Sequence, residues 1–189
     1  MRELRIHGRG GQGAVIASKV LAVAIFKEGR WVQSFPAFGV ERRGAPVTAF
    51  LRVADSPVLL RCEVTTPDDL IVLDPTLLDA IDITAGLKPG GSILINSAAA
   101  PEAYAHIGPY RIATVDASAI ALKYGLGSRT QPIVNTAIVG AFAVFSGLVS
   151  LDKVCAAIED EVPRHAEENV AAAREAAELV RIAQEAAHV

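Results

Sequence analysis

Cysteine is scarce in this sequence, and its scarcity excludes several kinds of site. Among 189 residues there are only two cysteines, Cys62 and Cys155, and they lie far apart. Neither belongs to a Cys-x-x-Cys pair, so the chain has no iron–sulfur or zinc cassette of its own. The four histidines also lack the spacing of metal ligands, and we predict no metal site. We interpret both cysteines as buried free thiols of a cytoplasmic protein.

Strong charge of one sign and long apolar runs are absent as well. The formal net charge of -3 gives no electrostatic footprint for nucleic acid. No apolar run reaches the roughly 18 residues that a membrane span requires. The nearest one, 133–149, contains Asn135, Thr136 and Ser146. Because a strand pattern begins almost at the first residue, we also expect no signal peptide. We therefore expect a cytoplasmic protein with neither a nucleic-acid partner nor a membrane span.

Strand and helix patterns alternate along the chain. We expect strands at 4–6, 31–35, 47–53, 70–73, 92–96 and 110–115. We expect helices at 14–26, 75–81, 101–106, 117–124, 133–148 and 151–161, and from 164 to the C-terminus. This alternation predicts an α/β, Rossmann-like three-layer domain over 1–189, with a mostly parallel sheet and a C-terminal helical segment. The helix at 133–148 is apolar on every side, which places it at the centre of the fold or at a subunit contact.

A glycine loop follows the first expected strand. Gly8, Gly10 and Gly13 match the pattern G-x-G-x-x-G between a strand and a helix, which is the context of a dinucleotide-binding loop. Free backbone N–H groups at the start of the next helix would face an anion. The candidate cofactor-binding residues of this loop are Gly8, Gly10, Gly11, Gln12 and Gly13.

The position that would confirm NAD binding does not fit. NAD-binding folds carry an acidic residue about 20 positions past the loop, where it binds the ribose. Gln33 occupies that region here. A purely structural strand–helix turn and a contact with another anion or cofactor therefore remain as alternatives, and we favour the latter.

The segment 35–46, FPAFGVERRGAP, is an unusually rich loop. It combines two aromatic residues, two prolines and two glycines with three consecutive charged residues. Loops of this kind commonly carry function. We interpret Arg42 and Arg43 as candidates for contact with a phosphate or with a partner carboxylate. The alternative is that they pair with Glu41 or Asp55, or are solvated.

Five further residues are candidates for a functional or a structural role. Asn135 and Thr136 open an apolar helix, where they could contact a cofactor or cap the helix. Gln12 could bind a ligand or cap its own helix. We expect His7, at the end of the first strand, to be partly buried with its hydrogen bonds satisfied. Trp31 is expected in the core or at an interface.

The motifs together resemble one family. GRGGQG, then FPAFGVERRGAPVTAFLRV, then Asp55-Ser56-Pro57-Val58 are similar to the gamma subunit of 2-oxoacid:ferredoxin oxidoreductases. The variant at 41–46 is most similar to the pyruvate and 2-oxoisovalerate branch. Segments 134–137 and 140–142, and Asn169, are similar too, so the resemblance covers essentially the whole chain.

The resemblance implies a reaction and a set of partners. These complexes convert a 2-oxoacid and coenzyme A to carbon dioxide and acyl-CoA, using thiamine diphosphate with magnesium and iron–sulfur clusters that reduce ferredoxin. This chain has neither the GDG thiamine signature nor a cysteine cluster motif. The resemblance thus implies that alpha and beta subunits bind thiamine and a ferredoxin-like delta subunit holds the clusters. We assign this chain no cofactor and no catalytic residue of its own, and expect it to be inactive alone.

Several alternatives stay open at this stage. We expect pyruvate as the substrate of the complex, but 2-oxoisovalerate or an arylglyoxylate would suit the same motifs. A free-standing nucleotide-binding module is a different class, against which both Gln33 and the 35–46 loop argue. A third alternative is an adaptor that joins catalytic subunits and contacts no ligand.

Overall fold

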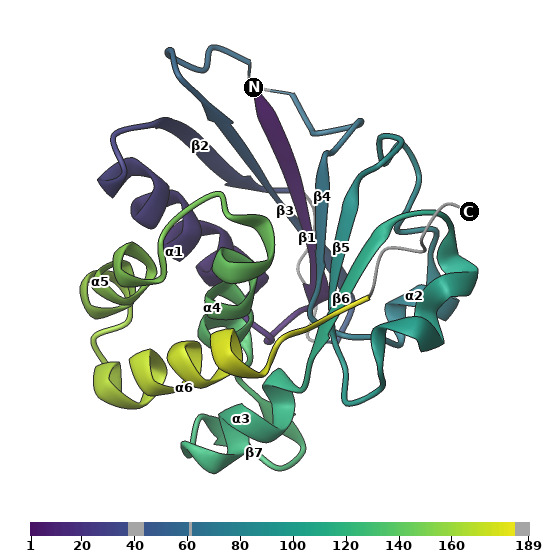
Figure 1. Cartoon of the computed structure of the whole chain (residues 1–189). Coiled ribbons are helices and arrows are strands. Elements are labelled where there is room, and N and C mark those ends of the chain that lie inside the picture. The colour runs from purple at the N-terminus through teal and green to yellow at the C-terminus, as the bar shows by residue number, and fades with distance from the viewer. Residues whose placement is uncertain (38–43, 61, 184–189) are drawn as a thin grey trace.

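A seven-stranded mixed sheet forms the middle of the computed structural model, which describes residues 1–37, 44–60 and 62–183 (Figure 1). In spatial order its strands are β2 (Trp31–Pro36), β3 (Pro46–Ala54), β1 (Arg2–Arg9), β4 (Asp69–Val72), β5 (Ser92–Asn96), β6 (Arg111–Val115) and β9 (Arg181–Ile182). The four central strands β1, β4, β5 and β6 are parallel, as predicted. Antiparallel strands extend the sheet at both edges. A separate hairpin consists of β7 (Gly127–Ser128) and β8 (Gln131–Pro132).

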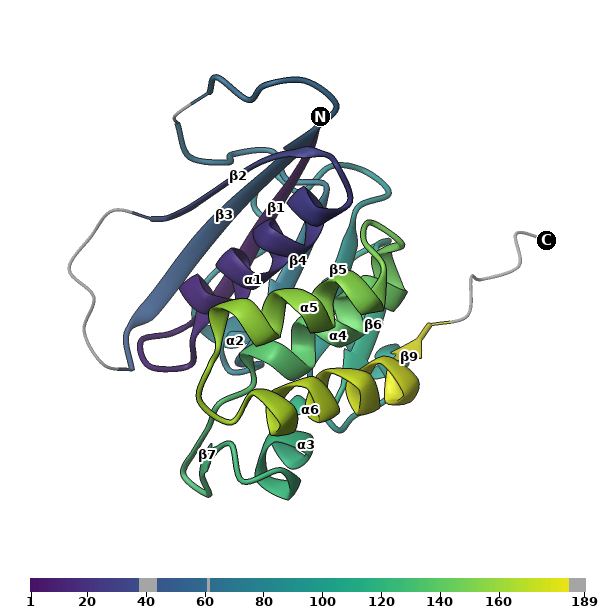
Figure 2. The same cartoon turned by 90° about the vertical axis from the view of Figure 1, so that its left-hand side faces the viewer.

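Helices cover both faces of the sheet, which confirms the expected α/β layers (Figures 1 and 2). One face carries α1 (Ala14–Lys27), α3 (Ala117–Lys123), α4 (Asn135–Ser146), α5 (Leu151–Glu161) and α6 (Ala166–Leu179). The other carries α2 (Leu77–Ala80) and the 3-10 helix η1 (Pro101–Ile107). Successive residues of a strand point to opposite faces. Accordingly, Ile71 and Leu94 belong to the larger core, and their neighbours Leu70 and Ile93 to the smaller one.

Helix α4 is the central helix of the larger layer. Ten of its twelve residues are buried, and it packs against α1, α5 and α6. The backbones of α4 and α6 approach each other at Gly140, where an added Cβ atom would overlap the backbone carbonyl of Ala173 in α6. The apolar character of α4 on all sides is therefore explained by its place inside the fold.

The C-terminal end of the chain differs from the prediction. The helix expected from 164 onward begins at Ala166 and ends at Leu179, and Val180 is extended. Arg181 and Ile182 then pair with the edge strand β6, and the backbone N–H of Ala183 donates to the carbonyl of Ile112. The open edge of β6 offers backbone hydrogen bonds that a continued helix would leave unmade. No helix of the described segments is long and apolar enough to cross a membrane.

Three single-residue expectations are wrong or only partly right. Cys62 is exposed, whereas Cys155 is buried as predicted. Trp31 is 50% exposed and so does not belong to the core, which leaves the interface interpretation as a prediction. Asn135 is not a helix cap, because the cap of α4 is Val134 and makes no side-chain hydrogen bond to the helix.

Candidate functional site

The glycine loop lies where the sheet changes the direction of its connections. After β1 the chain passes to α1 on one face, and after β4 it passes to α2 on the other. In open α/β sheets, ligands bind outside the carboxyl ends of the strands at such a switch point. A cleft of about 320 Å³ opens there, with Thr130, Gln131 and Pro132 of the β7–β8 hairpin on one side. The rest of its lining is Arg9, Gly10, Gly11, Gln12, Gly44 and Asp74.

Asp74 is the centre of a hydrogen-bond network at the floor of this cleft. Its Oδ2 accepts from Arg9 Nε at 3.1 Å and from Gln12 Nε2 at 3.0 Å. Its Oδ1 accepts from the backbone N–H and the hydroxyl of Thr76, at 3.0 and 2.7 Å. Burial alone would raise the pKa of Asp74, but these bonds from Thr76 and Gln12, with the charge of Arg9, lower it. The carboxylate is therefore ionised at neutral pH and fixed in place.

Arg9 links three segments of the chain through its guanidinium. Besides Asp74, it reaches the hydroxyl of Thr76 from Nη2 at 2.8 Å and the carbonyl of Gly44 from Nη1 at 3.2 Å. Two backbone bonds reinforce the last contact: Gly10 N–H donates to Ala45 at 2.9 Å, and Gly44 N–H donates to Gly10 at 3.1 Å. The glycine loop is thus bonded directly to the C-terminal end of the 35–46 loop. We call these three bonds the loop joint.

Gln12 is a brace within the glycine loop. Its Oε1 accepts from the backbone N–H of Arg9 at 2.8 Å, and its amide nitrogen donates to Asp74. The helix-cap interpretation is wrong, because α1 has no side-chain cap hydrogen bond. Gln12 also lines the cleft, so contact with a ligand stays a prediction. The N-cap of α1 is Gly13, which makes no side-chain bond, and the first turn of α1 holds no acidic residue. The positive end of the α1 dipole is therefore not neutralised by an acidic side chain of its first turn, which favours the binding of an anion there.

Gly13 and Asn135 bring the amino ends of α1 and α4 together. Gly13 has φ of +83°, and a Cβ there would lie 2.6 Å from Asn135 Nδ2. Gly8 is also closely packed, since its Cβ would lie 3.0 Å from Leu73 Cδ1. Asn135 Oδ1 accepts from the backbone N–H of Thr136 at 2.8 Å. Glycine is therefore required at position 13 both by conformation and by space.

Thr136 connects α4 to α6 rather than to the cleft. It is fully buried, and its hydroxyl donates to Asn169 Oδ1 at 2.7 Å. Asn169 Nδ2 in turn donates to the carbonyl of His165 at 2.8 Å. The contacts of Thr136 are those of a structural link between two helices.

His7 is more buried and less well bonded than expected. Only 6% of the residue is exposed, and its Nδ1 lies 3.5 Å from Thr48 Oγ1. Its Nε2 is buried and has no hydrogen-bond partner among the described residues. Burial, together with the charge of Arg5, lowers the pKa of His7 to about 4. The imidazole is therefore neutral at pH 7, and the expectation of a satisfied histidine is wrong.

The predicted site residues are thus partly brought together. The glycine-loop residues line the cleft or pack beside it, and Asn135 touches Gly13. Arg42 and Arg43 lie outside the described residues, although Gly44, the next residue, belongs to the loop joint. Sequence reasoning missed Arg9, Asp74 and Thr76. The signal for Asp74 was a polar residue directly after a buried strand, at the carboxyl edge where ligands bind.

An open α/β sheet with a glycine loop and a cleft at its switch point defines a Rossmann-like ligand-binding or subunit domain. Comparison with known proteins identifies the family within this class. Residues 3–179 match the family described as pyruvate ferredoxin/flavodoxin oxidoreductase, and the chain belongs to this family.

The relatives match over nearly their whole length. The pyruvate/ketoisovalerate oxidoreductases common subunit gamma of Thermococcus kodakarensis is 51% identical, with 93% of this chain and 95% of that protein covered. Pyruvate synthase subunit PorC of Methanothermobacter thermautotrophicus is 48% identical, covering 95% and 96%. The crystal structure of pyruvate oxidoreductase subunit PORC from Thermotoga maritima superimposes with a TM-score of 0.82 at 36% identity, covering 97% and 98%.

Proposed function

We propose that this chain is the gamma subunit of a pyruvate:ferredoxin oxidoreductase complex, which oxidatively decarboxylates pyruvate to acetyl-CoA. The observation that carries the proposal is end-to-end similarity to gamma subunits at about half identity. The glycine loop and the 35–46 loop, on which the family resemblance rests, are bonded to each other in the fold.

The chain acts within the complex as a subunit without redox chemistry of its own. The sequence has no thiamine signature and no cysteine cluster motif. Thiamine diphosphate, magnesium and the iron–sulfur clusters are therefore assigned to alpha, beta and delta partners in the cytoplasm. The Thermococcus relative is named as common to pyruvate and ketoisovalerate enzymes. We infer from this that the other subunits select the 2-oxoacid.

The glycine-loop cleft is the place where this chain would contact coenzyme A. The cleft has a volume of about 320 Å³, which accommodates a part of the coenzyme, so the other subunits would bind the remainder. The amino end of α1 favours an anionic group. Within the cleft, Arg9 is already neutralised by Asp74, so the positive charge for a phosphate would come from Arg42 or Arg43. The loop joint fixes the residue that follows them.

Arginine-to-lysine variants test this role. Guanidinium binds phosphate through a two-pronged contact that lysine cannot reproduce. Losing one charge-assisted contact costs about 1.5–3 kcal/mol, or roughly ten- to a hundredfold in binding. We expect Arg42→Lys or Arg43→Lys to raise the KM for coenzyme A while the complex still assembles. Arg30→Lys is the control, because Arg30 pairs with the exposed Asp55 on the surface.

The same variants separate the coenzyme role from an adaptor role. If Arg42 and Arg43 contact a partner carboxylate, the KM for coenzyme A stays constant and assembly weakens. Wild-type KM and wild-type assembly in both variants, and in Arg42→Ala/Arg43→Ala, would contradict any contact of these arginines with an anion. A complex purified from the source organism without this chain, yet fully active on pyruvate, would contradict the proposed function itself.

A further inference from the structure

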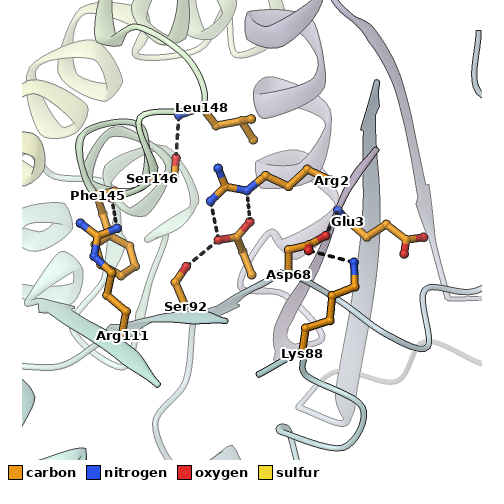
Figure 3. Close-up of polar contacts among 10 residues, drawn as sticks. Arg2, Glu3, Asp68, Lys88, Ser92, Arg111, Phe145, Ser146 and Leu148 are labelled. Atoms are coloured by element: carbon orange, nitrogen blue, oxygen red, sulfur yellow. Dashed lines mark hydrogen bonds and ion pairs between the residues drawn. The ribbon is translucent and has the colours of Figure 1, made fainter. Parts of the chain in front are cut away.

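A second hollow lies at the opposite end of the strands from the cleft, where the parallel strands begin. Figure 3 shows the polar side chains around it. Its volume is about 310 Å³. The strand register places Asp69, Ser92 and Arg111 in one row across β4, β5 and β6. Arg2 from β1 and the turn at 88–91 complete the wall. We call this feature the amino-edge hollow.

Two ion pairs line the amino-edge hollow. Arg2 donates from Nε and Nη2 to both oxygens of Asp69, at 2.6 and 2.7 Å, and Ser92 donates to the same carboxylate at 2.5 Å. Asp69 is only 1% exposed. Its hydrogen bonds with Arg2 raise the pKa of the Arg2 guanidinium above its ordinary value. Lys88 Nζ donates to Asp68 at 2.8 Å. These two cations are therefore balanced by carboxylates of the same chain.

Arg111 is the cation that stays unbalanced. Its guanidinium lies 4.5 Å from the centre of the Phe145 ring, and its Nη1 donates to the Phe145 carbonyl at 2.8 Å (Figure 3). These contacts fix the side chain at the carboxyl end of α4, where a cation is favourable. No ion pair joins Arg111 to a carboxylate of the described residues. Its Nε and Nη2 donors make no bond within the described part of the chain, and the residue is exposed.

The net charge of the hollow favours one kind of anionic group over another. Three cations face two carboxylates, which leaves one uncompensated positive charge. One carboxylate would neutralise it, whereas a phosphate dianion would leave excess negative charge beside Asp68 and Asp69. A guanidinium with two adjacent free donors also matches a carboxylate in a two-pronged contact.

We propose that the amino-edge hollow receives one acidic side chain of a partner subunit, which pairs with Arg111. This proposal rests on the proposed function, because it requires that the chain is a subunit. Under this proposal, the two ends of the parallel strands have different functions. The carboxyl edge holds the ligand cleft, and the amino edge docks a neighbouring protein through an arginine that is already held in position.

The test measures association of the purified full-length chain with the remaining subunits of its complex. Arg111→Gln should weaken the association about tenfold, as expected for one charge-assisted contact. Lys88→Gln should weaken it less, because Lys88 is already paired. The matched control is Arg174→Gln, which removes another exposed arginine that pairs with Asp152 elsewhere. The control should change the association constant by less than twofold. Melting temperatures of the isolated variants show whether each one folds.

The outcomes separate this proposal from the proposed function. An Arg111→Gln chain that folds and associates like the wild type overturns the docking proposal alone. If Arg111→Gln does not fold, Arg111→Lys takes its place, because lysine keeps the charge but cannot make the two-pronged contact. Wild-type association of a folded Arg111→Lys chain then overturns the proposal. Binding of inorganic phosphate to the isolated chain, abolished in Arg111→Gln, also overturns it in favour of a small-anion site. A wild-type chain that associates with none of the subunits overturns the proposed function as well.

Discussion

Replacing Asp74 with asparagine removes the negative charge on which the glycine-loop network depends. The asparagine amide keeps one oxygen, which can serve either the Thr76 donors or the Arg9 and Gln12 donors. If the oxygen accepts from Thr76, the new NH₂ group faces Arg9 Nε and Gln12 Nε2, which are also donors. One side of the network is therefore left without its acceptor in either orientation.

The size of the effect follows from the contacts. A hydrogen bond to a charged group contributes about 1.5–3 kcal/mol. The Asp74 side chain is 15% exposed and Arg9 28%, so solvent screens part of the ion pair. With two such bonds lost and partial screening, we expect the free energy of unfolding to fall by about 2–3 kcal/mol. The loosened Arg9 also releases the Gly44 carbonyl, so the KM for coenzyme A in the assembled complex should rise.

Asp82 provides a matched control within the same chain. It makes the same turn as Asp74, since its Oδ1 accepts from the backbone N–H and the hydroxyl of Thr84 at 3.0 and 2.7 Å. It is exposed and accepts no hydrogen bond from an arginine or glutamine side chain of the described residues. Asp82→Asn therefore removes the charge of the same kind of turn, while the remaining oxygen can still accept from Thr84. Urea unfolding of the isolated chain and coenzyme A kinetics of the complex measure both variants. Equal losses in Asp74→Asn and Asp82→Asn would refute the role assigned to the network.

Two further predictions concern the buried interior. His7 titrates at about 4 when folded and near 6.5 when unfolded, so the unfolded state binds more protons between these values and stability falls as the pH drops from 6.5 to 4. The loss of stability reaches about 3 kcal/mol and should be absent in His7→Gln. Identical pH profiles of unfolding for the wild type and His7→Gln would contradict this prediction. Gly140→Ala should destabilise the chain by about 1–3 kcal/mol, because the added methyl group overlaps the Ala173 carbonyl where α4 meets α6. An unchanged melting temperature would show that α6 shifts without cost.

Local patterns were enough to predict most of the fold. The strand–helix alternation and the apolar runs identify the parallel strands, and α5 lies at the predicted residues. The end of α6 was mispredicted, because helix-forming residues continue to the C-terminus. In the structure, Arg181 and Ile182 instead pair with β6, which is distant in the sequence. A pattern in one segment carries no information about a backbone partner that lies about 70 positions away.

The candidate site was predicted only in part for the same reason. The glycine loop has a local signature, and so it was found. The loop joint depends on Gly44 and Ala45, and the network depends on Asp74, all of which meet Arg9 or Gly10 only after folding. The bonds of Gln12 to the Arg9 N–H and to Asp74 were not predicted, because Asp74 lies 62 positions away along the chain and meets Gln12 only after folding. Arg111 was not singled out, since nothing near it along the chain reveals Phe145.

The most direct test of the central claim is an add-back assay. The alpha, beta and delta subunits are prepared without this chain and assayed for coenzyme A-dependent reduction of ferredoxin by pyruvate, before and after the purified chain is added. We expect negligible activity without the chain and recovery that saturates at a fixed ratio. The chain alone should show no activity, no bound thiamine diphosphate and no iron–sulfur absorbance. Full activity of the other subunits without this chain, or pyruvate decarboxylation by this chain alone, would contradict the central claim.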